Sequence, residues 1–176
     1  MLIAFSVSAW ADPVEIYKNE GATGTSGGIT ATGNVNTKSN GNPGNSFANT
    51  SSSNTTFTFS GFSLSEYTNL TLSIDAAFKS FPYTVETWPY ATVTFYKGEN
   101  TVKTDNTTIS WSSKGSDYST KTFNNLPDFD RIVIVGSPAT GTTQKGDATT
   151  NYALYMDNIT LTGVAPTEPG VSVTPI

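Results

Sequence analysis

The segment from residue 81 to 90 holds the side chains best suited to bind a ligand. It reads Phe-Pro-Tyr-Thr-Val-Glu-Thr-Trp-Pro-Tyr, and exposing four aromatic rings within ten residues is unfavourable unless they meet a partner. Sugar rings have apolar C–H faces that stack on aromatic rings, while polar side chains bind their hydroxyl groups. The pattern predicts a sugar platform of Tyr83, Trp88 and Tyr90, with Glu86 as the polar partner. In the alternative, Phe81 and Trp88 fold inward and close one end of the sandwich.

A carboxylate near the end of the chain, Asp157, is the candidate metal ligand that the residues themselves indicate. If residues 152–162 form a regular strand, Asp157 lies on the same inward face as Ile159 and Leu161. Because a buried, unpaired carboxylate is strongly unfavourable, it needs a cation or several donors. Calcium, which prefers oxygen ligands, would satisfy it in a structural role. Two alternatives stay open: a β-bulge at Asp157-Asn158 that turns the acid to solvent, or a carboxylate that accepts backbone N–H groups.

Residue types that are missing exclude much of enzyme chemistry. The chain has no His and no Cys, which removes Ser-His-Asp catalysis, thiol nucleophiles and the usual zinc ligands. The net charge is −5, Arg131 is the only arginine and the lysines are scattered, so we do not expect nucleic-acid binding. Glycoside hydrolysis needs a closely spaced pair of carboxyl groups, and the acids Glu66, Glu86, Glu99 and Asp105 occur singly.

The elements that must position these residues are strands. Apolar residues alternate with polar ones at Phe57 and Phe59, at Leu70 to Ile74, and at Val93 and Phe95, with Gly-containing turns between the runs. The abundance of Thr and aromatic residues suits pleated strands and excludes a helical bundle. The pattern predicts an all-β fold, a two-sheet antiparallel β-sandwich.

Three further local structures are predicted. Short strands around Ile29 and Phe47 should interrupt the Gly-, Ser- and Asn-rich stretch before residue 55. The continuous apolar run 131–135 is typical of a strand covered on both faces. Trp111 and Tyr118 flank a Lys-Gly-Ser-Asp turn, which favours a cross-strand pair in a hairpin.

Both ends of the chain differ from the middle. Residues 1–11 are apolar and close in Ala-Trp-Ala, which resembles the end of a truncated signal peptide and predicts a secreted or cell-surface protein. This segment is too short for a membrane span, which needs about 20 residues. Residues 165–176 are rich in proline and predict a linker to a further domain. The globular domain is therefore expected within residues 12–164.

Three segments together resemble a known group of modules. They begin at Ile16-Tyr17-Lys18-Asn19-Glu20-Gly21, at Phe62-Ser63-Leu64-Ser65-Glu66-Tyr67, and at Tyr152-Ala153-Leu154-Tyr155-Met156-Asp157-Asn158-Ile159. Their order resembles the jelly-roll modules of secreted bacterial proteins, which include carbohydrate-binding modules and galactose-binding-like domains. The resemblance implies a structural Ca²⁺ bound by Glu20 and Asp157, with Glu15 as the alternative early ligand. It also implies a jelly-roll form of the sandwich.

These observations predict a non-catalytic, exported binding module that recognises a polysaccharide or glycan through its aromatic segment. The alternative of another class is a structural or adhesive surface domain without a small ligand. A glycoside hydrolase or lyase is the least favoured of the three. Exposure separates the first two readings, because a binding module should present Trp88 and a tyrosine to solvent, whereas a structural domain should bury them.

Overall fold

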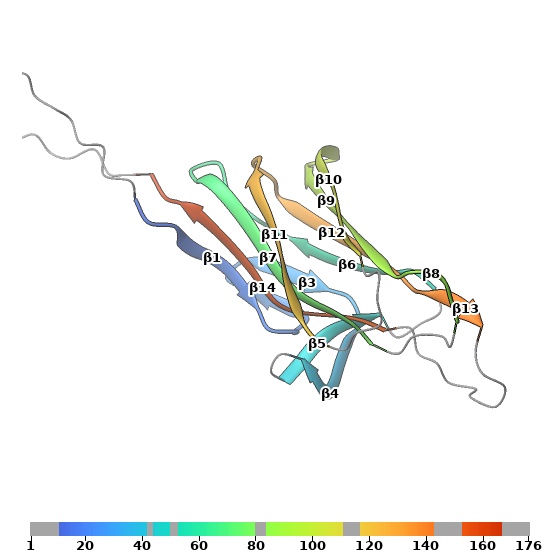
Figure 1. Cartoon of the computed structure of the whole chain (residues 1–176). Helices are drawn as coiled ribbons and strands as arrows, with labels where there is room; N and C mark the ends of the chain where they lie inside the picture. The colour runs from blue at the N-terminus through green and yellow to red at the C-terminus, as the bar shows by residue number, and fades with distance from the viewer. Residues whose placement is uncertain are drawn as a thin grey trace, which may run out of the picture.

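Two antiparallel sheets form most of the protein. Its computed structural model describes residues 11–41, 44–49, 53–79, 84–110, 117–142 and 153–166. Sheet A has the order β11-β7-β14-β5-β4, with β1 also paired to β14 (Figure 1). Sheet B has the order β10-β9-β12-β6-β3-β2. A small third sheet joins β8 to β13. The predicted all-β jelly-roll sandwich is confirmed.

The strands have the following bounds. Sheet A contains β1 (Val14–Asn19), β4 (Val35–Gly41), β5 (Gly44–Asn49), β7 (Thr68–Lys79), β11 (Ser119–Leu126) and β14 (Ala153–Val164). Sheet B contains β2 (Gly24–Ser26), β3 (Ile29–Thr32), β6 (Thr55–Ser60), β9 (Tyr90–Lys97), β10 (Asn100–Ser110) and β12 (Arg131–Ser137). The third sheet contains β8 (Thr84–Thr87) and β13 (Thr140–Thr142).

The core between the two sheets is built from phenylalanine rings. Inward residues of β6, β7 and β9 alternate with polar outward residues, as the sequence pattern predicts. The ring of Phe47 packs edge-on against Phe57 and Phe59, with centroids 6.0 and 5.3 Å apart. Phe95 meets Phe129 at 5.1 Å in the same core. Edge-to-face aromatic packing adds stability beyond the area that the rings bury.

Two predictions about strands are wrong. In β12, Ile132 and Ile134 are buried, whereas Val133 and Val135 are half-exposed, so only one face of this strand is covered. Its outward valines lie beside threonines of β6 and β9 and not under a further layer. The predicted hairpin around residues 111–118 is wrong as well, because β10 pairs with β9 in sheet B and β11 pairs with β7 in sheet A. Trp111 itself lies outside the described residues.

The stretch before residue 55 behaves as predicted. The strands β3 and β5 contain the buried anchors Ile29 and Phe47, and β2 and β4 pair with them. The described ranges contain no helix long and apolar enough to cross a membrane.

The last strand, β14, changes neighbours halfway along one edge. Its first part pairs with β5, with Met156 opposite Phe47, and its second part pairs with β1, where Ile159 lies opposite Asn19. Its other edge pairs with β7 throughout, but the register shifts between Asp157 and Thr160. Asn158 takes a left-handed backbone conformation there, with φ of 46°. A β-bulge therefore marks the point where one neighbour replaces the other.

Candidate functional site

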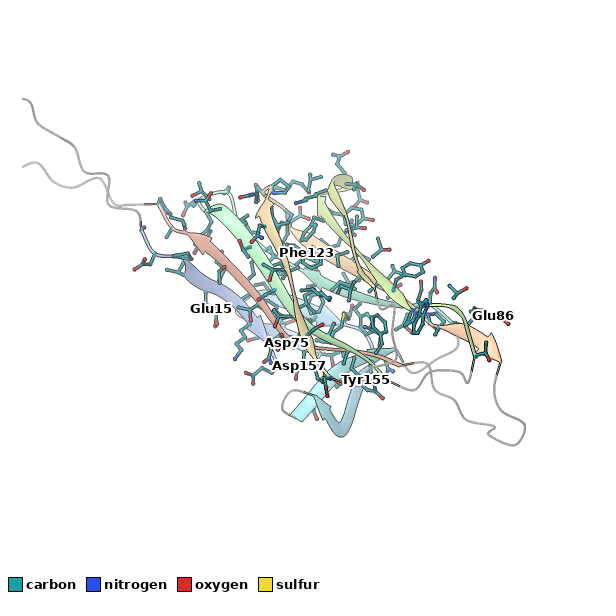
Figure 2. The ribbon with its side chains drawn as sticks, viewed as in Figure 1. Glu15, Asp75, Glu86, Phe123, Tyr155 and Asp157 are labelled. Carbon is teal, nitrogen blue, oxygen red and sulfur yellow. The ribbon has the colours of Figure 1, made fainter. Side chains whose placement is uncertain are left out.

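The predicted sugar platform lies where two paired strands leave the sandwich. The pair β9–β12 continues into the pair β8–β13, and Thr140 lies opposite Thr87 in the smaller sheet. Trp88 and Pro89 separate β8 from β9, because proline has no N–H for a sheet and the residue before it is held extended. Figure 2 shows Glu86 in this region, at the far end of the molecule from β1.

Burial alternates from Trp88 onward. Pro89 is buried, Trp88 before it is half-buried and Tyr90 after it is 40% exposed. Glu86 is exposed as well, whereas Tyr83 lies outside the described residues. Tyr90, the first residue of β9, lies on the outer side of sheet B, and the alternation of an extended chain predicts the same side for Trp88.

Exposure of aromatic rings is selective in this protein. Every phenylalanine in the described ranges is buried. The described phenylalanines are Phe47, Phe57, Phe59, Phe62, Phe78, Phe95, Phe123 and Phe129. Tyr90, in contrast, is among the few large apolar side chains that are clearly exposed. The alternative in which Phe81 and Trp88 fold inward stays open, because Trp88 is half-buried and Phe81 lies outside the described residues.

A second cluster of polar and aromatic side chains lies on the outer face of sheet A. Asp75 of β7 and Asp157 of β14 are directly opposite each other, and Figure 2 shows them close to Tyr155. Asp75 accepts hydrogen bonds from the Thr120 hydroxyl at 2.6 Å and from the Asn158 side-chain amide at 2.9 Å. The sequence pattern missed this cluster because its members come from three strands far apart in the chain.

The bulge at Asp157-Asn158 changes the face on which the acid lies. The prediction that Asp157 shares an inward face with Ile159 and Leu161 is wrong. The bulge adds one residue to β14 and so shifts the alternation of inward and outward side chains: Met156 points into the core before the bulge, and Ile159 does so after it. The bulge alternative is confirmed, yet it does not bring the acid to solvent, since Asp157 is fully buried. Its carboxylate accepts the backbone N–H of Asn158 at 2.8 Å, as the second alternative expects.

Tyrosines and small residues close the outer face over Asp157. Tyr155 packs with Ala48 and Tyr118 in a small apolar cluster and is only 8% exposed. The pKa of Tyr118 is raised to about 12, mainly by burial. The Ser46 side chain opposes this rise, and the charge of Asp157 adds to it. The Tyr118 hydroxyl therefore lies in a closed, acidic environment.

The loop after β1 packs closely against β5. A Cβ added to Gly21 would meet the backbone carbonyl carbon of Asn45 at 2.6 Å, and the φ of Gly21 is +78°. Glycine therefore fits the place where the ends of β1 and β5 meet beside β14.

The predicted calcium ligands take very different positions. Asp157 is fully buried, whereas Glu20 is exposed and its carboxylate lies 2.5 Å from the ammonium group of Lys18. Glu15 is exposed on β1, opposite Thr162. No three acidic, His or Cys side chains gather into a metal-binding group in the described part of the chain. A Ca²⁺ here would need mostly backbone carbonyl oxygens as ligands, and the calcium site stays a prediction.

The geometry of the acid pair is unsuited to turnover. Glycosidases hold two carboxyl groups on opposite sides of the scissile bond, with the substrate between them. Asp157 is closed off from solvent, and both oxygens of Asp75 already accept hydrogen bonds. A sugar therefore has no route between these two carboxyl groups, and the pair is suited to stabilising the sheet.

Solved structures with a similar fold include several carbohydrate-binding modules. A mutant of the family 29 module CBM29-2, in complex with mannohexaose, has a TM-score of 0.50 and 16% identity, covering 86% of this chain and 92% of the module. CBM29_1 from Piromyces equi has a TM-score of 0.46 and 15% identity, covering 88% and 91%. A family 16 module, Carbohydrate Binding Module-2, has a TM-score of 0.44 and 14% identity, covering 76% and 84%.

No protein-family model matches the chain, and no curated protein matches its sequence. The similarity to CBM29-2 shows that the chain has the fold of a carbohydrate-binding module, as the resemblance in its sequence implies.

Proposed function

We propose that the protein is a non-catalytic carbohydrate-binding module whose platform is formed by Trp88 and Tyr90, with Glu86 as the polar partner. Tyr83 is proposed as the third ring of the platform, on the sequence alone. One observation carries the proposal: Tyr90 is 40% exposed, next to a half-exposed Trp88, in a protein whose described phenylalanines are all buried. Exposed rings beside a few polar groups are suited to stack on sugars.

The similar solved structures support the ligand class. The CBM29-2 mutant holds mannohexaose, and a further module, TmCBM61, is solved in complex with β-1,4-galactotriose. Both ligands are neutral chains of sugars. The exposed ring of Tyr90 and the polar side chains around it suit a ligand of that kind.

Affinity gel electrophoresis tests the proposal, with mannan, β-1,4-galactan and other plant and microbial polysaccharides in the gel. We expect at least one polysaccharide to retard the protein. Trp88→Ala and Tyr90→Ala should then weaken the binding about tenfold or more, as expected for aromatic anchors of a binding site. Thr122→Ala, on an exposed position of the opposite sheet, is the matched control and should bind as the unchanged protein does.

Two results would contradict the proposal. One is no retardation by any polysaccharide of the panel. The other is unchanged binding by both aromatic variants when their thermal midpoints show that they are folded. If a variant loses both binding and folding, its ring has a structural role. Tyr90→Ser then distinguishes a binding role from a structural role, because Tyr90 is the more exposed residue and its variant should stay folded.

We further propose that a structural Ca²⁺ joins the ends of the first and last strands near Glu20 and Asp157. Adjacent pairing of β1 and β14 and the burial of Asp157 support it. A ligand that binds only the folded state raises the thermal midpoint, so EDTA should lower the midpoint and added Ca²⁺ should restore it. An identical midpoint in EDTA and in Ca²⁺ excludes the site.

Export to the cell surface or the medium, as one module of a longer protein, is proposed on the composition of residues 1–11 and 165–176. Fractionation of the source cells, followed by mass spectrometry of the protein, tests both points. We expect it outside the cytoplasm, with further sequence after residue 176.

A further inference from the structure

A line of outward side chains extends from the platform along the whole of β9. Tyr90, Thr92, Thr94 and Tyr96 lie on the outer face, because the residues between them, Ala91, Val93 and Phe95, are fully buried in the core. Tyr96 follows Tyr90 by six positions, which places the two about 20 Å apart at roughly 3.4 Å per residue. Trp88, two positions before Tyr90, is half-buried, and the alternation of an extended chain predicts that it continues the line.

Short, uncharged side chains form the floor between the two tyrosines. Thr92 lies beside Val135 of β12, and Thr94 lies beside Val133. On the far side of β12, threonines of β6 continue both rows. These valines and threonines are half-exposed or exposed. No side chain of this block carries a charge, and none is long enough to form a wall across the floor.

The far end of the line is held in place by a hydrogen-bond network. The guanidinium carbon of Arg131 lies 4.6 Å from the centre of the Tyr96 ring, and its Nη2 donates to the Gly98 carbonyl at 3.3 Å. The Gly98 N–H donates to the Asp130 carboxylate at 2.7 Å, and the Asp130 N–H donates to the Tyr96 carbonyl at 2.8 Å. A side-chain pair held in this way loses little freedom when a ligand binds.

We propose that Tyr96 and Arg131 form a second subsite, and that an extended neutral glycan runs along β9 from Trp88 and Tyr90 to this pair. The inference rests on the proposed function and adds to it the length and the direction of the ligand. Tyr96 and the guanidinium plane offer an apolar edge and N–H donors for one sugar unit. The uncharged floor carries the units between the two ends. A disaccharide is too short to reach both ends, so the protein selects long chains.

Titration calorimetry with oligosaccharides tests this inference, using a series from disaccharide to hexasaccharide cut from the polysaccharide that retards the protein in the gel. We expect the affinity to rise along the series. Thr94→Lys places a long charged side chain on the floor, and we expect it to weaken hexasaccharide binding about tenfold or more and to leave disaccharide binding unchanged. Tyr96→Ala should do the same. The matched control is Thr122→Lys, the same change on an exposed position of sheet A.

The outcomes separate this inference from the proposed function. The second subsite is excluded if the affinity does not rise with chain length. It is also excluded if Thr94→Lys weakens the binding of short and long ligands equally, or weakens the binding of neither. In each case the platform at Trp88 and Tyr90 stands. If the unchanged protein binds no glycan, both are excluded. Should Tyr96→Ala unfold the protein, Thr94→Lys decides the question, because Thr94 is half-exposed and outside the core.

Discussion

The two outer faces of the sandwich carry similar residue types and use them in opposite ways. On sheet B, Tyr90 is 40% exposed at the end of an uncharged row along β9. On sheet A, Tyr155 is 8% exposed and Asp157 is fully buried. β9 keeps its alternation and its neighbour β12 along its length, whereas β14 changes neighbours from β5 to β1 and forms a bulge.

This difference shows what decides the use of a tyrosine or an aspartate on a sheet. A regular strand presents its outward side chains in an open row, which a long ligand can follow. A bulge between two neighbouring strands turns the side chains into a closed cluster, whose hydrogen bonds are satisfied within the protein. We therefore expect substitutions on sheet B to change binding, and substitutions on sheet A to change stability.

The largest expected effect compares the two tyrosines. Tyr155→Ala removes a ring that packs against Ala48 and Tyr118, so it should lower the free energy of unfolding by about 3 kcal/mol. Tyr90→Ala removes a ring that is 40% exposed and should lower it by less than about 1 kcal/mol. Urea denaturation followed by tryptophan fluorescence measures both.

Binding should show the reverse order. Tyr90→Ala should weaken binding in the affinity gel about tenfold or more, whereas folded Tyr155→Ala protein should be retarded as the unchanged protein is. Equal losses of stability in the two variants would contradict the distinction between an open and a closed face.

The next effect concerns the buried carboxylate. Asp157→Ala leaves the backbone N–H of Asn158 without its acceptor, so the free energy of unfolding should fall by about 1–3 kcal/mol. Glu86→Ala, on the exposed region of the platform, should change it by less than about 0.5 kcal/mol. Thermal and urea unfolding in EDTA measure both values without a contribution from Ca²⁺. An Asp157→Ala protein as stable as the unchanged one would contradict the enclosed position of this side chain.

A smaller effect should appear at alkaline pH. Burial raises the pKa of Tyr118 from 10.0 to about 12. The folded state therefore holds the Tyr118 proton more strongly than the unfolded state does. The stability that protonated Tyr118 contributes is complete below pH 10 and is lost as the pH rises toward about 12. Burial raises the pKa of Tyr17 as well, with Asn19 lowering it, and adds to the same loss.

Urea denaturation across this pH range, on the unchanged protein and on Tyr118→Phe, measures the contribution of Tyr118. The variant should lose less stability between neutral and alkaline pH, while retaining the part that comes from Tyr17. The same slope in both proteins would show that Tyr118 is more open to solvent than its contacts with Tyr155 indicate.

Sequence patterns predicted the elements whose alternation is regular. The inward phenylalanines of β6 and β9 and the short strands around Ile29 and Phe47 follow from local rules of spacing. Each of these rules depends only on residues that are close together in the chain.

Features that depend on the arrangement of distant strands were outside the reach of those patterns. The facing pair of Asp75 and Asp157 requires the pairing of β7 with β14, and the bulge at Asn158 depends on the change from β5 to β1. The subsite of Tyr96 and Arg131 requires the pairing of β9 with β12. An Asp-Asn step inside an apolar strand was the only local signal, and it predicted the bulge only as an alternative.

The smallest expected effect is that of salt on binding. The floor of sheet B between Tyr90 and Tyr96 is uncharged, and we propose a neutral ligand. The affinity for this ligand should therefore change by less than about twofold as the ionic strength rises to about 1 M, where the Debye length falls to about 3 Å. Calorimetry with the hexasaccharide at low and high NaCl measures this.

Thr94→Lys provides the comparison for the salt experiment. Its residual affinity for a neutral chain should be weaker but equally independent of salt, because the lysine acts by its length. A steep loss of affinity with salt in the unchanged protein would instead indicate an acidic ligand bound through Arg131, and would overturn the assignment of a neutral glycan to this face.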